Sequence, residues 1–217
     1  MFEREKRRPK VGALQNPGAL SLCACDQDTL ARFLATHHIA AWDVLLFGDG
    51  SGSVWEQPCG WASVSIERVA PQTSGAAGPV RRVWYGALNN GTVNMAEALA
   101  YLAPLNWLVA QDEDRRKNTG MRRTAHRIHI FTDSQYCRDS GNRAGRSLGK
   151  NSVLWAAFDV FKRHGYLIEW HWIRRDQVAL NQYVDLLSKL ARGLFVKNKL
   201  RRRLETTTQV RVADCNP

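Results

Sequence analysis

Three stretches in the first half of the chain have the pattern of β-strands. The first is an apolar run that enters a glycine-rich turn, WDVLLFGDGSGS from Trp42. Two alternating stretches follow, CGWASVSIERV from Cys59 and VRRVWYGAL from Val80. Alternation with a period of two is typical of strands with one buried face. Because turn-like segments join the three stretches, we predict an antiparallel meander.

Along the rest of the chain, helical patterns alternate with strand patterns. The expected helices cover residues 26–39, 94–110 (with a kink or break at Pro104), a short segment from Ser134, residues 151–165, and a stretch from about Leu180. The expected strands are Arg127–Phe131 and residues 166–175, with a polar loop over 111–125 and a frayed tail after Glu205. Pro104 breaks the pattern because proline cannot donate the helical hydrogen bond.

This order of elements predicts an α/β fold. Three antiparallel strands are followed by strands that alternate with helices, which indicates a five-stranded mixed sheet with parallel additions and helices on both faces. Ligands of such sheets collect where strands end and connections diverge. We expect a basic N-terminal extension with a short helix over 1–41, a catalytic domain over 42–195, and a basic helix end and tail over 196–217.

The charge balance of the chain indicates the class of partner that it binds. The 217 residues carry 31 Lys and Arg against 20 Asp and Glu, a net charge of +11. Such a balance favours a polyanionic partner, with nucleic acid ahead of an anionic membrane surface. The alternative is a solvated basic surface without a specific partner.

Cysteine usage and hydropathy indicate a compartment. Five scattered cysteines, an odd number, are typical of reduced thiols, and the first residues do not resemble a signal peptide. No apolar run is long enough for a membrane span. We therefore expect a cytoplasmic protein, a monomer with no membrane partner.

Four carboxylates lie in or next to four different predicted elements. They are Asp49 at the end of the first strand, Glu97 in the first turn of a helix, Asp133 after the fourth strand and Asp185 in the last helix. Each has an ordinary explanation as a turn residue, a helix-dipole acid, a helix cap or a solvated residue. Asp185 borders an apolar stripe, where a charge needs a partner. Magnesium, which takes oxygen ligands, would provide one.

The four segments around these carboxylates resemble the type 1 ribonuclease H family. The segments are GDGSGS, NMAEAL, FTDSQYC and NQYVDLLSKLA, within a similarity that runs from about Trp42 to Ala191. The resemblance implies the ribonuclease H-like fold and a metal-dependent endonuclease that hydrolyses the RNA strand of RNA–DNA hybrids with two Mg²⁺ ions, for which Mn²⁺ can substitute. It implies that Asp49 bridges both ions, that Glu97 and Asp133 complete one site, and that Asp185 completes the other.

The resemblance also suggests residues that contact nucleic acid. Asn94 and Gln135 match family positions that contact the hybrid in its minor groove, although Asn94 can also be read as a helix N-cap. Ser51 and Gly52 would allow a close approach of the backbone. Further candidates are Arg138, Arg146, Arg175 and Asn181.

Two features of the family are missing. The loop before the last helix has no histidine; Arg175 and Asp176 stand in that region, and we interpret the nearby His171 as structural. The segment after FTDSQYC is too short for the basic handle that some members use to grip the hybrid. Two alternatives therefore stay open: a DNA-directed nuclease of the same fold, similar to resolvases or transposases, and an inactive hybrid-binding module.

Overall fold

The structure is a computed structural model that describes residues 27–53, 55, 57–68, 79–120, 126–143, 151–175, 178–201 and 211–215. For residues 27–29, 195–201 and 211–215 the description covers the backbone alone. The helices are α2 (Gln27–Thr36), α3 (Val93–Thr119), α4 (Gln135–Asn142), α5 (Ser152–Arg163) and α6 (Ala179–Arg201). The strands are β1 (Val44–Ser51), β2 (Gln57–Glu67), β3 (Val80–Gly91), β4 (Arg127–Thr132), β5 (Leu167–Trp172) and β6 (Arg211–Cys215).

The five predicted strands form one mixed sheet, as expected. The strand order is β5-β4-β1-β2-β3-β6. Strands β1, β2 and β3 form the antiparallel meander, whereas β4 runs parallel to β1 and β5 runs parallel to β4. The sixth strand, β6, pairs antiparallel with β3. The expectation of a frayed tail is therefore wrong for residues 211–215, which extend the sheet through backbone hydrogen bonds.

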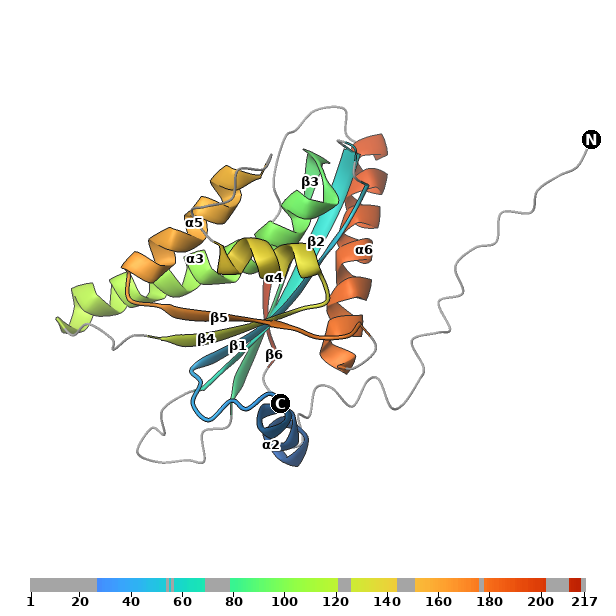
Figure 1. Ribbon diagram of the computed structural model, residues 1–217. Coiled ribbons are helices and arrows are strands. Elements are labelled where there is room, and N and C mark those ends of the chain that lie inside the picture. The colour runs from blue at the N-terminus through green and yellow to red at the C-terminus, as the bar shows by residue number, and fades with distance from the viewer. Residues whose placement is uncertain are drawn as a thin grey trace, which may run out of the picture.

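Helices cover both faces of the sheet, which confirms the predicted layers. Figure 1 shows α3, α4 and α5 on one side and α6 on the other. The first layer buries Tyr101, Trp155 and Phe158 against Ile128 and Ile130. A second core packs α2 and α6 on the opposite face through a set that includes these residues: Leu30, Phe33, Leu45, Phe47, Phe131, Leu180 and Val184.

Helix α3 is longer than the sequence pattern predicts. It continues through Pro104 and through half of the expected loop, to Thr119. Proline in a helix interior costs about 3 kcal/mol, but burial of Tyr101, Leu105 and Leu108 holds the helix on the sheet on both sides of Pro104. The helix ends at Gly120, whose left-handed φ of 68° allows its N–H to donate to the Arg116 carbonyl.

Two predicted helix caps are also corrected. Thr92, not Asn94, caps α3, because its hydroxyl accepts a hydrogen bond from the N–H of Met95. Ser134, not Asp133, caps α4 by accepting from the N–H of Cys137. The Asp133 carboxylate is therefore available for another role.

Candidate active site

Strands β1 and β4 bring two of the four predicted carboxylates to one edge of the sheet. The strands are parallel, and Phe47 lies opposite Phe131 in their register. Asp49 comes two residues later on β1, and Asp133 comes two residues later, directly after the end of β4. Because residues i and i+2 of a strand point to the same face, the two carboxylates leave the sheet side by side.

Glu97 reaches the same edge because α3 packs very closely on β1. A Cβ atom at Gly50 would lie 2.5 Å from the backbone nitrogen of Glu97, so only glycine fits there. One turn later the Tyr101 hydroxyl donates to the Gly48 carbonyl at 2.6 Å. Glu97 is the fifth residue of α3, in its second turn rather than its first. The contacts at Gly48 and Gly50 fix its position over β1.

Two donors from α4 and the residue before it orient the Glu97 carboxylate. The Ser134 hydroxyl and the Cys137 thiol both donate to Glu97 Oε2, each at 3.1 Å. Burial raises the pKa of Glu97, an effect that these two donors oppose. Burial also raises the pKa of the Cys137 thiol well above its ordinary value, so the thiol keeps its proton and remains a donor.

Asp185 comes from α6 on the other face of the sheet. Its Oδ2 accepts from Lys189 Nζ at 2.5 Å, and its side chain is 21% exposed. It lies close enough to the buried Asp49 to contribute to the raised pKa of that acid. The structure therefore brings together all four carboxylates that the sequence singled out, which we call the carboxylate cluster (Asp49, Glu97, Asp133 and Asp185).

The cluster concentrates negative charge around Asp49. Burial, with further contributions from Asp133, Asp185 and Glu97, raises the pKa of Asp49 to about 8. Like charges gathered in a site out of water favour the protonated form of one member. Without a bound cation, Asp49 therefore carries a proton at neutral pH.

The donor types of the carboxylate cluster suit a divalent cation, although no three of its ligand atoms lie within 4.8 Å of one another. Asp49 Oδ1 accepts from the N–H of Gly50 at 2.9 Å, whereas Oδ2 is buried and has no hydrogen-bond partner among the described residues. The outer members already attract cations: Arg175 Nε lies 2.7 Å from Asp133 Oδ2, and Lys189 pairs with Asp185. A set of carboxylate oxygens with one unpartnered buried oxygen suits a hard, oxygen-seeking ion.

The predicted nucleic-acid contacts around β1 and α3 lie next to this cluster. Ser51 is buried, and its hydroxyl has no partner among the described residues. Gly52 is packed so tightly that a Cβ there would lie 2.8 Å from that of Cys59. Asn94 is half-buried in the first turn of α3.

The other residues predicted to contact nucleic acid differ in their solvent exposure and in their ion pairs. Gln135 is exposed at the start of α4, and Arg138 pairs with Asp139 at 2.8 Å. Arg175 is 66% exposed despite its bond to Asp133, whereas Asn181 is only 1% exposed. Arg146 lies outside the described residues.

Several residues of the site were missed by the sequence analysis. Ser134 and Cys137 hold Glu97, Tyr101 anchors α3, and Lys189 neutralises Asp185. The Lys189 contact has a local signal, since a lysine four residues after an aspartate on a helix forms an ion pair. The others join residues far apart in sequence, and no local pattern indicates them.

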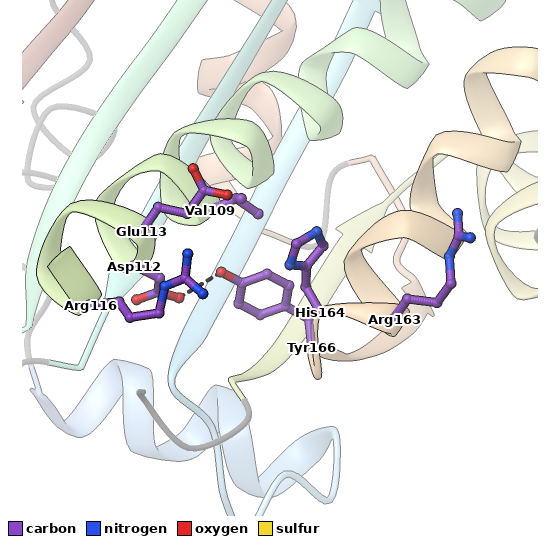
Figure 2. A pocket seen from close by; sticks show the side chains of 7 residues that line it. All are labelled: Val109, Asp112, Glu113, Arg116, Arg163, His164 and Tyr166. Carbon is purple, nitrogen blue, oxygen red and sulfur yellow. Dashed lines mark hydrogen bonds between the residues drawn. The ribbon is translucent and has the colours of Figure 1, made fainter. Parts of the chain in front are cut away.

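The described residues also form a polar pocket of about 260 Å³ at the opposite end of the sheet. Figure 2 shows its lining from the end of α3 and the α5–β5 connection: Val109, Asp112, Glu113, Arg116, Arg163, His164 and Tyr166. It lies where β4 and β5 begin, whereas the carboxylate cluster lies where β1 and β4 end. Asp112 is fifteen residues after Glu97 on α3, which corresponds to about 22 Å along the helix axis.

Comparison with known sequences is negative. No protein-family model matches the chain. No curated protein matches it either.

Comparison with solved structures identifies the fold. LC9-RNase H1, described as a type 1 RNase H with the type 2 active-site motif, is 21% identical, with a TM-score of 0.53 over 80% of this chain and 78% of that one. LC11-RNase H1, isolated from compost by a metagenomic approach, is 14% identical, with a TM-score of 0.50 over 72% of this chain and 99% of that one. The N-terminal RNase H domain of rv2228c from Mycobacterium tuberculosis is 20% identical, with a TM-score of 0.49 over 73% and 99%. The first two matches show that the chain has the ribonuclease H-like fold.

A search of the described helices found none with the length and apolar character needed to cross a membrane.

Proposed function

We propose that this protein is a metal-dependent endonuclease that hydrolyses the RNA strand of RNA–DNA hybrids and leaves a 3′-hydroxyl. The observation that supports this most strongly is the convergence of Asp49, Glu97, Asp133 and Asp185 around a buried Asp49 oxygen without a partner among the described residues. The ribonuclease H-like fold supports the substrate class, and the net charge of +11 supports a polyanionic ligand. We assign the catalytic domain to residues 42–195, flanked by the basic segments 1–41 and 196–217.

The carboxylate cluster would hold two Mg²⁺ ions, for which Mn²⁺ can substitute. Asp49 would contact both ions, Glu97 and Asp133 would complete one site, and Asp185 would complete the other. Bound there, the ions supply activation of the attacking water and stabilisation of the leaving 3′-oxygen.

The surrounding side chains prepare these ligands. Ser134 and Cys137 donate hydrogen bonds to Glu97 Oε2, so the orientation of this carboxylate is fixed before substrate binds. Arg175 holds Asp133 from the solvent side and remains exposed enough to contact a phosphate as well. In the loop where related enzymes have a histidine, Arg175 is therefore our candidate for positioning the substrate.

The hybrid would lie across the edge that carries Asn94 and Gln135. Asn94 is half-buried and Gln135 is exposed, and both flank the carboxylate cluster on different helices. Ser51 and Gly52 continue the surface at the end of β1. Since hybrid duplexes present 2′-hydroxyl groups and a wide minor groove, we expect recognition by shape, with little preference for base sequence. We expect a cytoplasmic monomer with no membrane partner.

Single-turnover cleavage of an end-labelled hybrid tests the proposal. The reaction is run with Mg²⁺, with Mn²⁺ and with EDTA, beside double-stranded RNA and double-stranded DNA. We expect cleavage of only the RNA strand of the hybrid, in a metal-dependent manner. Cleavage of double-stranded DNA alone would instead identify a DNA-directed nuclease, and tight hybrid binding without cleavage by either metal would identify a binding module.

A pair of conservative variants links the activity to the cluster. Asp49→Asn keeps the shape of the side chain and removes its charge, so we expect a loss of at least about 1,000-fold in the cleavage rate. Asp114→Asn makes the same change on the exposed, distant part of α3 and is expected to leave the rate unchanged. Equal rates for the two variants would refute the assignment of the site.

A further inference from the structure

We propose that the protein has a second metal site, separate from the carboxylate cluster, in which His129, Glu169 and His171 bind a transition-metal ion of the zinc class. We call these three residues the imidazole cluster. Their ligand atoms all lie within 4.8 Å of one another, and they are the one such group of His, Cys, Asp and Glu found in the described part of the chain.

Strand pairing brings the three residues together. Strands β4 and β5 are parallel, His129 lies opposite Glu169, and His171 lies two residues further along β5. His129 shares its sheet face with Phe131, whose ring stacks on that of His171 with centroids 5.0 Å apart. This is the face that α2 covers, since Phe33 packs on Phe131 at 4.9 Å.

The distances suit a single small ion. His129 Nδ1 lies 3.0 Å from His171 Nε2 and 3.5 Å from Glu169 Oε2, and the third side of the triangle, from His171 Nε2 to Glu169 Oε2, is 4.0 Å. Two ligand atoms that are each about 2.0–2.2 Å from a tetrahedral zinc ion lie about 3.3–3.6 Å apart. The glutamate is 66% exposed, so its carboxylate can adjust by the small amount required.

The backbone fixes the ring nitrogen that faces the ion. His129 Nε2 lies 3.0 Å from the carbonyl oxygen of Ala41. Because a carbonyl only accepts, Nε2 carries the hydrogen and the lone pair of the neutral ring is on Nδ1, which points into the cluster. A second-sphere hydrogen bond of this kind is the usual support of a metal-binding histidine.

Ring contacts hold His171 in place. Its side chain is 20% exposed, its ring stacks on Phe131, and its centroid lies 5.2 Å from that of His129. Two imidazoles and one carboxylate are the donor types that zinc takes in three-ligand sites, which keep a further position for water. Magnesium prefers oxygen ligands alone, so the imidazole and carboxylate clusters should select different ions.

The two clusters are also separated in space. Asp133 follows His129 by four residues along β4 and its end, which corresponds to about 13 Å of extended chain. Binding at the imidazole cluster would tie β4 to the edge strand β5 and, through the Ala41 carbonyl, to the segment that connects α2 to β1. The site is therefore structural in character and does not depend on the proposed nuclease activity.

Metal titration of the full chain tests this proposal. The protein is stripped with EDTA, freed of chelator, and titrated with Zn²⁺ against a chromophoric competitor; Co²⁺ is then used as a spectroscopic probe. We expect one tight site and visible ligand-field absorption typical of four- or five-coordinate cobalt with nitrogen ligands. Separately, histidine NMR signals of His129 and His171 should shift on addition of Zn²⁺, and the melting temperature should rise.

Variants assign the site. We expect His129→Ala and His171→Ala each to weaken Zn²⁺ binding by about 100-fold or more, and Glu169→Gln by about tenfold or more. Glu169 is exposed, so its variant keeps the test valid even if a histidine variant fails to fold. His164→Ala, at an exposed histidine after α5, and Asp49→Asn should both retain full binding.

Two results would overturn the proposal. One is native chain that binds no Zn²⁺ or Co²⁺. The other is binding that survives Glu169→Gln and His129→Ala but is lost in Asp49→Asn, which would place the ion in the carboxylate cluster. Neither result depends on cleavage of a hybrid.

Discussion

The carboxylates at the two ends of the sheet have opposite surroundings. At the end where β4 and β5 begin, Asp112 Oδ2 accepts from the Tyr166 hydroxyl at 2.6 Å (Figure 2). It also lies 2.7 Å from His126 Nε2. At the other end, Asp49 Oδ2 is buried with no partner among the described residues. The protein itself satisfies Asp112, whereas Asp49 is surrounded by other acids.

This difference is the one expected between a structural acid and a metal ligand. An internally satisfied carboxylate stabilises the fold, and removing it is costly. A carboxylate held near like charges lowers the stability of the metal-free fold and gains its partner when a cation binds. Removing Asp112 should therefore lower stability and leave activity unchanged. Removing the charge of Asp49 should raise the stability of the metal-free fold and abolish activity.

The largest expected effect on stability is at Asp112. In Asp112→Ala, the Tyr166 hydroxyl and the His126 ring, which is only 2% exposed, lose the acceptor that they share. We expect the free energy of unfolding to fall by about 3 kcal/mol, measured by urea denaturation. Hybrid cleavage per folded molecule should not change.

Asp114→Ala is the matched control for this prediction. It removes an exposed acid two residues away on the same helix and should change the free energy of unfolding by less than about 0.5 kcal/mol. An Asp112→Ala variant as stable as this control would show that the contacts of Asp112 with Tyr166 and His126 contribute nothing to the stability of the fold. Loss of cleavage in folded Asp112→Ala would show that the Asp112 end of the sheet is coupled to the activity of the carboxylate cluster.

The next effect is the pH dependence of stability without metal. The pKa of Asp49 is about 8 in the folded chain and near 3.8 in the unfolded chain. As pH rises between these values, the unfolded state releases a proton that the folded state keeps, so the native chain loses stability across this window. Asp49→Asn has no such proton, and we expect it to gain on the order of 2 kcal/mol over the native chain between pH 4 and pH 8.

Denaturation in EDTA at both pH values measures this gain. Mg²⁺ should reduce the advantage of Asp49→Asn at pH 8, because the ion binds the native carboxylates and stabilises the folded chain by mass action. Asp114→Asn reports any general effect of removing one acid. A constant difference between Asp49→Asn and the native chain from pH 4 to pH 8 would mean that Asp49 ionises normally.

Much of the fold was predictable because its signals are local. An apolar run predicted the first strand, alternation predicted the other four main strands, and helical spacing predicted α2 and the later helices. What failed depends on tertiary contacts: α3 continues through Pro104 because Tyr101 and Leu105 pack on the sheet. Strand β6 follows no strong apolar pattern and is defined by its pairing with β3.

The carboxylates of the candidate site could be singled out from the sequence, but the contacts that support them could not. Four segments in the right order pointed to Asp49, Glu97, Asp133 and Asp185, since each segment carries a local motif. The bonds from Ser134 and Cys137 to Glu97 span 37 and 40 residues, and the contact between His129 and His171 spans 42. Such pairs depend on strand register and helix packing, which the sequence pattern does not specify. For the same reason His171 was interpreted as a structural residue without a partner being identified.

The smallest effect concerns the ammonium group at the rim of the carboxylate cluster. Lys189 is 57% exposed and pairs with Asp185 four residues earlier on α6. Because exposed pairs contribute little, Lys189→Ala should change the free energy of unfolding by less than about 0.5 kcal/mol. If Asp185 is a metal ligand, removing the competing cation should lower the Mg²⁺ concentration for half-maximal cleavage by about two- to fivefold.

Lys117→Ala provides the matched control, because Lys117 also pairs with a nearby aspartate, Asp114, at the remote end of α3. It removes the same charge from the protein as a whole, so it accounts for any general weakening of hybrid binding. A lower Mg²⁺ requirement in Lys189→Ala alone would show that local competition at Asp185 is the cause. A higher requirement in Lys189→Ala would mean that Lys189 assists substrate binding at the cluster, and Asp185 would then be an ion-pair residue like Asp112 rather than a metal ligand.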